Sequence, residues 1–175
     1  MVDALLGSFR GLVRIVRREM LRAVENALPA DVAIFAAAVA DWRVANAGEQ
    51  KLKKQPGHTT PELALVENPD ILATIAGRKK QRPKLVIGFA AETENVVANA
   101  KAKLARKHCD WILANDVSPQ SGVMGGDSNT ITLVRASGLE AWPPQSKDAV
   151  AAMLVTRIAD ALDEDERGDK QGDNR

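Results

Sequence analysis

The fold class is indicated by the stretch Lys84-Leu85-Val86-Ile87-Gly88-Phe89-Ala90-Ala91-Glu92-Thr93. Its first half, Lys84 to Phe89, is a buried-strand candidate through the continuous apolar run Leu85-Val86-Ile87. Such a run is typical of a parallel-sheet strand covered on both faces. The segment Thr93 to His108 follows with apolar residues at helical spacing, which predicts a helix. A buried strand followed directly by a helix is typical of α/β folds.

The rest of the chain repeats this alternation. Further central strands are predicted at Val32 to Val39 and Trp111 to Ala114, with a short one at most near Leu63 to Glu67. Helices are predicted from Met20 to Leu28 and from Ser146 to Leu162. A further helix is predicted with Asn68 as N-cap and Pro69 as its first residue, and it ends at about Arg78 or Lys80. A hairpin is predicted from Ile131 to Val134 and Leu139 to Trp142. We therefore predict a Rossmann-like α/β fold: a mostly parallel three-layer sheet with a C-terminal β-hairpin.

Composition narrows the functional classes. The 175 residues carry 24 Lys+Arg against 23 Asp+Glu, a net charge of +1, which disfavours a general nucleic-acid binder. The single cysteine, Cys109, excludes an intramolecular disulfide. The longest apolar run, Val32 to Ala40, is too short to span a membrane. We expect a cytoplasmic protein with neither a nucleic acid nor a membrane as partner.

The two ends of the chain differ from the middle. Leu5 to Arg18 has the pattern of a basic amphipathic helix, which is read either as a membrane-surface or targeting helix or as an ordinary surface helix. Residues 163–175 are acidic and polar, and we predict a disordered tail there.

Three polar clusters follow the predicted central strands. They are Asp41-Trp42-Arg43, Gly88 to Thr93, and Asn115-Asp116-Val117-Ser118. Ligands of open α/β sheets bind outside the carboxyl ends of the strands. The sequence therefore predicts a ligand site where these clusters meet.

Each cluster has more than one interpretation. Asp41 would hold a hydroxyl or a metal-bound phosphate, or form a salt bridge with Arg43. Phe89 would pack against a base or lie in the core. Thr93 would cap the following helix, whose N-terminus attracts phosphate. Asn115 and Asp116 would orient a substrate or close a turn.

The lysines form two further candidates. Lys51, Lys53 and Lys54 make a dense positive spot in a loop, suited either to a polyphosphate or to solvent. Lys103 and Lys107 share one helix face, whereas Lys101 lies on another; the spacing alone favours solvent-exposed lysines, and the alternative is an anion bound between the two charges.

Several chemistries lack their motifs. The chain has neither a Gly-x-x-x-x-Gly-Lys-Ser/Thr phosphate loop nor a Gly-x-Gly-x-x-Gly fingerprint. His58, His108 and Cys109 lack metal-ligand spacing, and we expect no metal site built by the protein.

Five ordered motifs resemble those of the phosphopantothenoylcysteine synthetase family, the ligase of coenzyme A biosynthesis that in bacteria is usually the C-terminal half of a fused decarboxylase/synthetase. The motifs run from Ala36 to Arg43, Lys51 to Lys54, Asn68 to Leu72, Gly88 to Thr93 and Ala114 to Ser118. The similarity covers about Glu19 to Leu162.

The resemblance implies an activity. In this family 4′-phosphopantothenate attacks the α-phosphate of CTP, pyrophosphate leaves, and cysteine then displaces CMP from the acyl-cytidylate. CTP would bind with Mg2+, and no flavin is expected in this chain. By position, the nucleotide-binding residues would be Asp41, Lys51, Pro69, Asp70, Ile71, Leu72, Phe89, Lys103 and Lys107, with Lys51 catalytic. Supporting residues would be Ala37, Ala38, Lys53, Lys54, Ala90, Asn115 and Asp116.

The chain departs from the family pattern at its start. The Gly-rich strand–loop and the Ser-Ser-Gly loop of the family do not precede Glu19, so we expect an N-terminally truncated synthetase: residues 1–18 unmatched, 19–162 the CTP-binding part. We expect the chain to form a homodimer through the predicted hairpin. A second chain that supplies the missing strands is a further expected partner.

The alternatives are a nucleotide-binding fragment without complete activity, an unrelated Rossmann-like methyltransferase or reductase, and an RNA-binding module.

Overall fold

The computed structural model describes residues 17–45, 63–119 and 128–172. The chain forms two compact units, each taken by itself below. One unit comprises Met1–Ala27 and Ala37–Ile71, and the other comprises Leu28–Ala36 and Leu72–Arg175.

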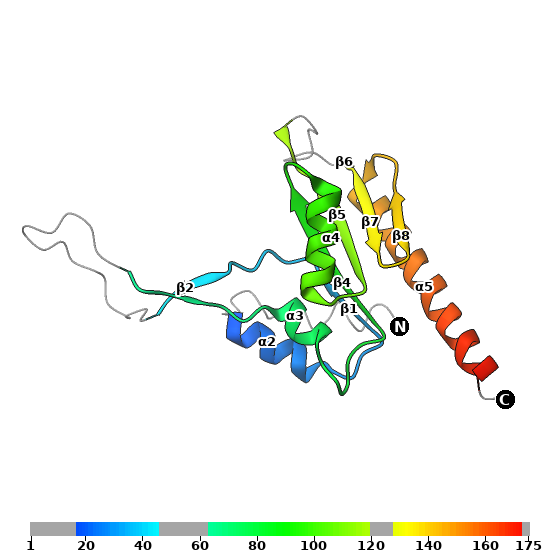
Figure 1. The fold of residues 1–175 in the computed structure, drawn as a ribbon, viewed down its shortest axis with the longest axis horizontal. Helices are drawn as coiled ribbons and strands as arrows, with labels where there is room; N and C mark the ends of the chain where they lie inside the picture. Colours follow the sequence, from blue (N-terminus) through cyan, green and yellow to red (C-terminus); the bar gives the residue numbers. More distant parts are fainter. Residues whose placement is uncertain (1–16, 46–62, 120–127, 173–175) are drawn as a thin grey trace, which may run out of the picture. The chain divides into compact units, whose positions relative to one another are not determined.

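The larger unit is built on a five-stranded sheet (Figure 1). Its strand order is β1 (Val32–Phe35), β4 (Leu85–Glu92), β5 (Trp111–Asp116), β7 (Ile131–Arg135) and β8 (Gly138–Ala141). The first three strands are parallel to one another, whereas β7 and β8 are antiparallel to their neighbours. The predicted parallel centre and C-terminal hairpin are both confirmed.

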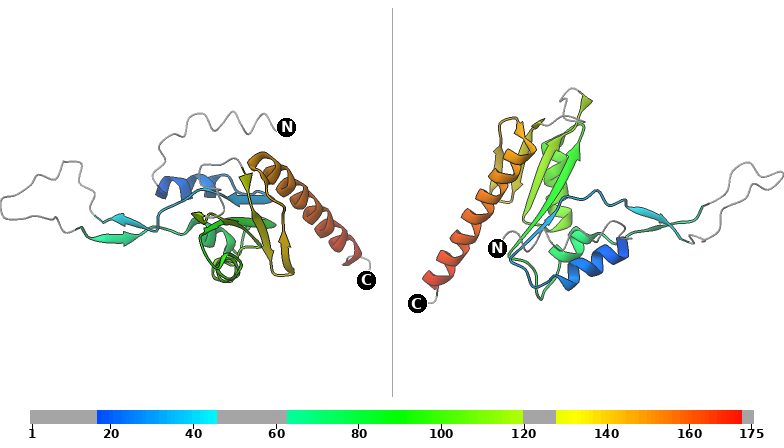
Figure 2. Two further views of the ribbon diagram at one scale, coloured as in Figure 1. Left: turned by 90° about the horizontal axis from the view of Figure 1, so that it is seen from above. Right: turned by 180° about the vertical axis from the view of Figure 1, so that it is seen from behind.

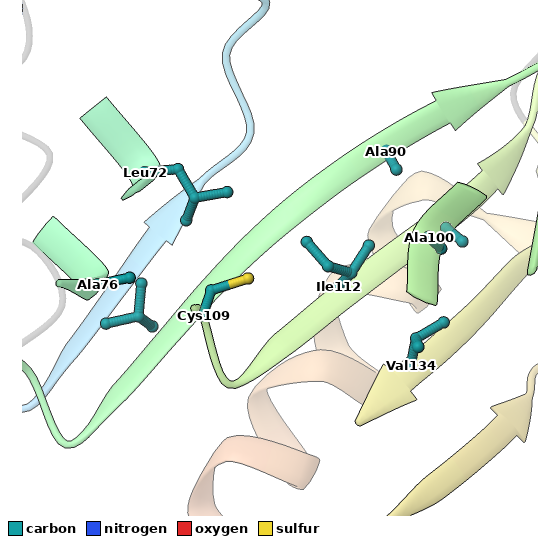
Figure 3. Close-up of a cluster of buried hydrophobic side chains, with 9 residues drawn as sticks. Leu72, Ala76, Ala90, Ala100, Cys109, Ile112 and Val134 are labelled. Atoms are coloured by element: carbon teal, nitrogen blue, oxygen red, sulfur yellow. The ribbon is translucent and has the colours of Figure 1, made fainter. Parts of the chain in front are cut away.

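Helices cover both faces of this sheet (Figure 2). Helix α4 (Val96–Lys107) and the α3 residues from Leu72 onward pack on one face; α3 runs Ile71–Ala76. Helix α5 (Lys147–Gly172) packs on the other face through Val150 and Leu154. Side chains of a strand alternate between faces, so β4 supplies Val86 and Ala90 to the first core and Leu85 and Ile87 to the second. Figure 3 shows the first of these cores. The layered α/β arrangement agrees with the prediction.

Polar contacts tie the edges of the sheet to the helices. Ser146 Oγ accepts a hydrogen bond from Ala149 N at 3.2 Å, so Ser146 caps α5 as predicted. Arg157 of α5 donates from Nε to Glu140 Oε1 of β8 at 2.8 Å, and Trp142 Nε1 donates to the same oxygen at 3.0 Å. A short ribbon of β6 (Ser128–Asn129) and β9 (Gln145–Ser146) precedes α5.

An arginine–aspartate pair holds the amino ends of β4 and β5. Arg82 Nη2 contacts both carboxylate oxygens of Asp110 at 3.0 Å, and the backbone N–H of Val86 donates to Asp110 Oδ2 at 2.7 Å. This end of the sheet is therefore stabilised by structural contacts, which leaves the carboxyl ends as the candidate ligand edge.

The smaller unit contains α2 (Arg17–Asn26) and a two-stranded ribbon. Strands β2 (Trp42–Val44) and β3 (Leu65–Glu67) pair antiparallel, with Trp42 opposite Glu67 and Val44 opposite Leu65. The sequence between them, residues 46–62, lies outside the described residues, as do residues 1–16 with most of the predicted basic helix.

Several predicted boundaries were wrong. The strand predicted to end at Val39 ends at Phe35, because four of the next five residues are alanine, which has low strand propensity. Asp41 therefore precedes β2 instead of following a sheet strand. The helix after Pro69 covers only Ile71–Ala76. Helix α5 continues to Gly172, so residues 163–172 are helical where we predicted disorder; the oppositely charged Asp163 and Arg167 are spaced i,i+4.

Candidate functional site

The carboxyl ends of β4 and β5 bring two of the predicted polar clusters together. Ala91 lies opposite Asn115 and Glu92 lies opposite Asp116 in the parallel pair. The backbone N–H of Val117 also donates to the Glu92 carbonyl oxygen at 2.9 Å. The second and third clusters therefore meet, as predicted, at the edge where α/β sheets bind ligands.

A lysine from α4 reaches this edge. Lys103 Nζ donates to the carbonyl oxygen of Phe89 at 2.8 Å. Burial lowers the pKa of Lys103 below its ordinary value, and the nearby charge of Glu92 opposes that shift. Lys101, two residues earlier, is exposed. The predicted difference between the two helix faces is confirmed, and Lys103 is a partly desolvated cation suited to an anionic ligand.

Phe89 itself is partly buried. Its side chain packs against the α5-side core, on the face opposite the α4-side core that contains Ala90. Of the two interpretations of Phe89, the core contact is therefore present, and its backbone carbonyl is the atom that meets Lys103. Ala90 is 1% exposed and belongs to the α4-side core.

Gly88 leaves room for Leu72 of α3 and Ile112 of β5 to pack closely against β4. A Cβ at this position would lie 2.6 Å from Leu72 Cδ2 and 3.0 Å from Ile112 Cδ1. Contacts this short are not tolerated by a rigid neighbour. The glycine therefore lets α3 approach the sheet.

The turn into α4 differs from the prediction. Thr93 does not cap the helix: the N-cap is Asn95, in the left-handed region with φ 50°, and it makes no side-chain capping bond. Asn99, which the sequence did not single out, donates from Nδ2 to Glu92 Oε2 and to the Glu94 carbonyl oxygen, each at 3.0 Å. No local pattern marks Asn99, because its contacts depend on the path of this turn.

The carboxyl end of β5 contains a hydrogen-bonded turn and a side-chain oxygen without a hydrogen-bond partner among the described residues. Asp116 Oδ1 accepts from the backbone N–H of Ser118 at 2.9 Å, and this bond lowers the pKa of the Asp116 carboxyl. Asp116 therefore closes a turn, one of its two predicted roles. Asn115 Oδ1 is buried and has no hydrogen-bond partner among the described residues.

The smaller unit carries the remaining described candidates. Asp41 is exposed, as are Ala37 and Ala38. Asn68, predicted as a helix cap, instead donates from Nδ2 to the Ala40 carbonyl oxygen at 2.9 Å. Pro69 and Asp70 are half-buried, and Ile71 is 5% exposed. Leu72, in the larger unit, is 9% exposed and belongs to the α4-side core.

Some predicted residues and chemistries stand apart from these clusters. Lys51, Lys53 and Lys54 lie outside the described residues. Lys107, one turn beyond Lys103, is half-buried. Burial raises the pKa of the Cys109 thiol to about 11, which keeps it protonated at neutral pH. The part of the chain that the structure describes contains no group of three His, Cys, Asp or Glu placed to hold a metal ion. No helix in that part has the length and apolar content needed to cross a membrane.

The fold is that of an α/β protein with a two-faced sheet, and polar clusters and a partly buried lysine at its carboxyl edge mark the candidate ligand site. Its family is established by comparison: residues 13–162 match the model of the DNA/pantothenate metabolism flavoprotein C-terminal domain, and the chain belongs to that family. The resemblance to phosphopantothenoylcysteine synthetases is thereby confirmed at the level of the family.

Relatives and solved structures agree with this assignment. The coenzyme A biosynthesis bifunctional protein CoaBC of Vibrio cholerae is 39% identical over 145 residues, which are 82% of this chain and 36% of that protein. CoaBC of Haemophilus influenzae is 42% identical over 142 residues, 81% of this chain and 34% of that protein. The crystal structure of a CoaBC C-terminal domain matches with a TM-score of 0.63 and 31% identity, over 84% of this chain and 65% of that domain. The chain thus spans about a third of the length of these bifunctional relatives.

Proposed function

We propose that this chain is the nucleotide-binding, C-terminal part of a bacterial phosphopantothenate–cysteine ligase of coenzyme A biosynthesis. The observation that carries the proposal is the family match over residues 13–162, within which all five motifs of the resemblance fall. The partly buried lysine beside the carboxyl end of β4 supports the binding of an anion there.

The reaction has two steps. A carboxylate oxygen of 4′-phosphopantothenate attacks the α-phosphate of CTP, the bond to the β-phosphate breaks, and pyrophosphate leaves. The amine of cysteine then attacks the acyl carbon of the acyl-cytidylate, loses a proton and displaces CMP. Both steps move negative charge onto a phosphate leaving group, so cations near the phosphates lower the barrier.

The lysines would supply part of that charge. Lys103 and Lys107 would bind the triphosphate, and Lys51 would stabilise the departing pyrophosphate as the catalytic residue. Asp41 would hold a hydroxyl of the nucleotide or a metal-bound phosphate. Phe89 and the Pro69 to Leu72 segment would make further contacts with the nucleotide. Several contacts would use backbone atoms. The supporting residues would be Ala37, Ala38, Lys53, Lys54, Ala90, Asn115 and Asp116.

Magnesium would enter with CTP. Mg2+ bound to nucleotides keeps several waters and takes only one or two carboxylates from the protein, so it needs no cage of three protein ligands. Glu92 and Asp116, which lie opposite each other in the β4–β5 pair, are the residues that would supply such a carboxylate. When bound, the ion would neutralise charge on the leaving pyrophosphate. The flavin of the bifunctional relatives' decarboxylase half is not expected to bind here.

A second candidate function is nucleotide binding without complete turnover. It is favoured by one observation: the matched region covers only 65% of the solved CoaBC C-terminal domain. In that case a further segment or a second chain would supply the acid-substrate pocket. We also propose a homodimer that uses the hairpin β7–β8, which a mass measurement in solution tests.

The decisive experiment measures two quantities on one sample. Pyrophosphate release is followed with CTP, Mg2+, 4′-phosphopantothenate and cysteine, and CTP binding is measured by calorimetry. Release that needs every substrate and is lost in Lys51→Gln supports the complete ligase. Binding without release supports the second candidate. A protein that neither binds CTP nor releases pyrophosphate contradicts both.

A further inference from the structure

Asn68 holds the two peptide groups on either side of Asp41. Its backbone N–H donates to the Asp41 carbonyl oxygen at 2.7 Å, and its side-chain Nδ2 donates to the Ala40 carbonyl oxygen at 2.9 Å. The Ala40 carbonyl belongs to the peptide before Asp41, and the Asp41 carbonyl belongs to the peptide after it. Because each peptide group is planar, holding both of them restricts φ and ψ of Asp41 and so the direction of its side chain.

Only one of these two bonds depends on the amide side chain. The backbone bond continues the β2–β3 pairing by one step beyond Trp42 and Glu67, and any residue except proline would make it. The bond to Ala40 requires a side-chain donor. Compared with an apolar residue at this position, Asn68 therefore adds one interaction, the side-chain hydrogen bond to the carbonyl oxygen of the peptide before Asp41.

The amide has a cost for the folded state. Asn68 is 6% exposed, and its Oδ1 is buried with no hydrogen-bond partner among the described residues. A buried acceptor without a partner destabilises the fold, and an apolar side chain of similar size avoids that loss. Ala40 is exposed, so its carbonyl oxygen has water as an alternative partner. The free energy of unfolding therefore does not explain why this position carries an asparagine instead of an apolar residue.

We infer that Asn68 is a positioning residue for nucleotide binding, which orients Asp41 by holding the Ala40 carbonyl. The inference rests on the proposed function, in which the Asp41 carboxylate contacts the nucleotide. A carboxylate fixed in direction before the ligand arrives binds more tightly than one that must be ordered on binding.

The first test separates stability from affinity. Asn68→Leu removes both the donor and the unpaired acceptor and keeps the same branched arrangement of side-chain heavy atoms. We expect an unchanged or higher midpoint of thermal unfolding, together with a CTP Kd raised about three- to tenfold, the effect of one hydrogen bond. Asn129→Leu is the matched control, because Asn129 Oδ1 is also buried without a partner among the described residues, and Asn129 belongs to β6 instead of the β2–β3 ribbon next to Asp41. Its CTP affinity should equal that of the wild type.

The second test uses pH to restore the donor. In Asn68→Asp the introduced carboxylate repels the Ala40 carbonyl oxygen at neutral pH, whereas its protonated form has an O–H group to donate. The ratio of variant to wild-type Kd should therefore fall as the pH is lowered. The neighbouring carboxylates Asp41, Glu67 and Asp70 are present in both proteins, so the wild type is the reference for their contribution.

Each outcome has one meaning. A wild-type protein that binds no CTP contradicts the proposed function, and the inference with it. If the wild type binds CTP and Asn68→Leu binds it equally well, only the inference is overturned. It is also overturned if Asn68→Leu loses stability and affinity together while Asn68→Asp shows no recovery at low pH, because that pattern describes a purely structural residue.

Discussion

Lys103 and Phe89, 14 residues apart in the chain, are joined by a 2.8 Å hydrogen bond from the lysine ammonium to the backbone carbonyl of β4. An ammonium group has three donors, and this contact uses one of them. The bond holds the charge of α4 beside the carboxyl end of the sheet, where the proposed triphosphate would bind.

Replacing Lys103 should weaken nucleotide binding far more than replacing its neighbour. Lys103→Met keeps the length of the side chain but removes the charge, and we expect the CTP Kd to rise about tenfold or more, as for a lost charge-assisted hydrogen bond. Lys101→Met is the matched control, because Lys101 is exposed on the same helix. Calorimetric titration of both variants checks the difference, and equal effects would count against a triphosphate contact at Lys103.

CTP affinity should depend on the charge state of Lys103. Because burial lowers the pKa of this lysine, it loses its proton at a lower pH than an exposed lysine does. The cation is the form that binds phosphate, so affinity should fall as the pH rises through the lowered pKa. Lys103→Arg stays charged in this range and should have a flatter profile. Titrations of CTP between neutral and alkaline pH compare the two proteins; parallel profiles would show that another group is responsible.

Glu140 should stabilise the packing of α5 on β8 above acidic pH. Its pKa is lowered, chiefly by the hydrogen bond from Arg157. A carboxyl whose pKa is lower in the folded state contributes stability above its unfolded-state pKa, and the contribution is lost as the pH falls through the folded-state pKa. We expect Glu140→Gln to lower the free energy of unfolding by about 1–2 kcal/mol at neutral pH.

The same prediction has an internal control. Asp160 also meets Arg157, at 3.7 Å, but its side chain is 61% exposed. Asp160→Asn should therefore change the free energy of unfolding by less than about 0.5 kcal/mol. Urea unfolding at neutral and acidic pH measures both variants. A Glu140→Gln effect that is as large at low pH as at neutral pH would contradict the assignment to charge.

Gly88→Ala should destabilise the contact between α3 and the sheet. The new methyl group would lie 2.6 Å from Leu72 Cδ2 in a packed core, and we expect a loss of about 1–3 kcal/mol. In a Leu72→Ala background the same substitution should cost less, because the nearest obstruction, the Leu72 methyl groups, is gone while Ile112 Cδ1 remains. Thermal or urea unfolding of the double-mutant cycle checks this, and additive effects would rule out the steric explanation.

Much of the fold could be predicted because its signals are local. The runs at Leu85 and Trp111 are apolar without interruption, and both became central strands, β4 and β5. The spacing of Val96, Ala100 and Leu104 predicted α4. One error concerned a local property: the alanines after Phe35 have low strand propensity and do not extend β1. Another concerned the path of the chain, because the left-handed Asn95, not Thr93, begins α4.

The candidate site divides in the same way. By itself, the sequence determined that polar clusters follow the strands and that Lys103 and Lys107 share a helix face, because residue order and helical spacing are properties of the local chain. The tertiary structure alone decided that Lys103 meets the carbonyl of Phe89, that Gly88 makes room for Leu72, and that Asn68 holds the Ala40 carbonyl 28 residues away. Such contacts join segments that are distant in the chain, and they exist only once the sheet and the ribbon have formed.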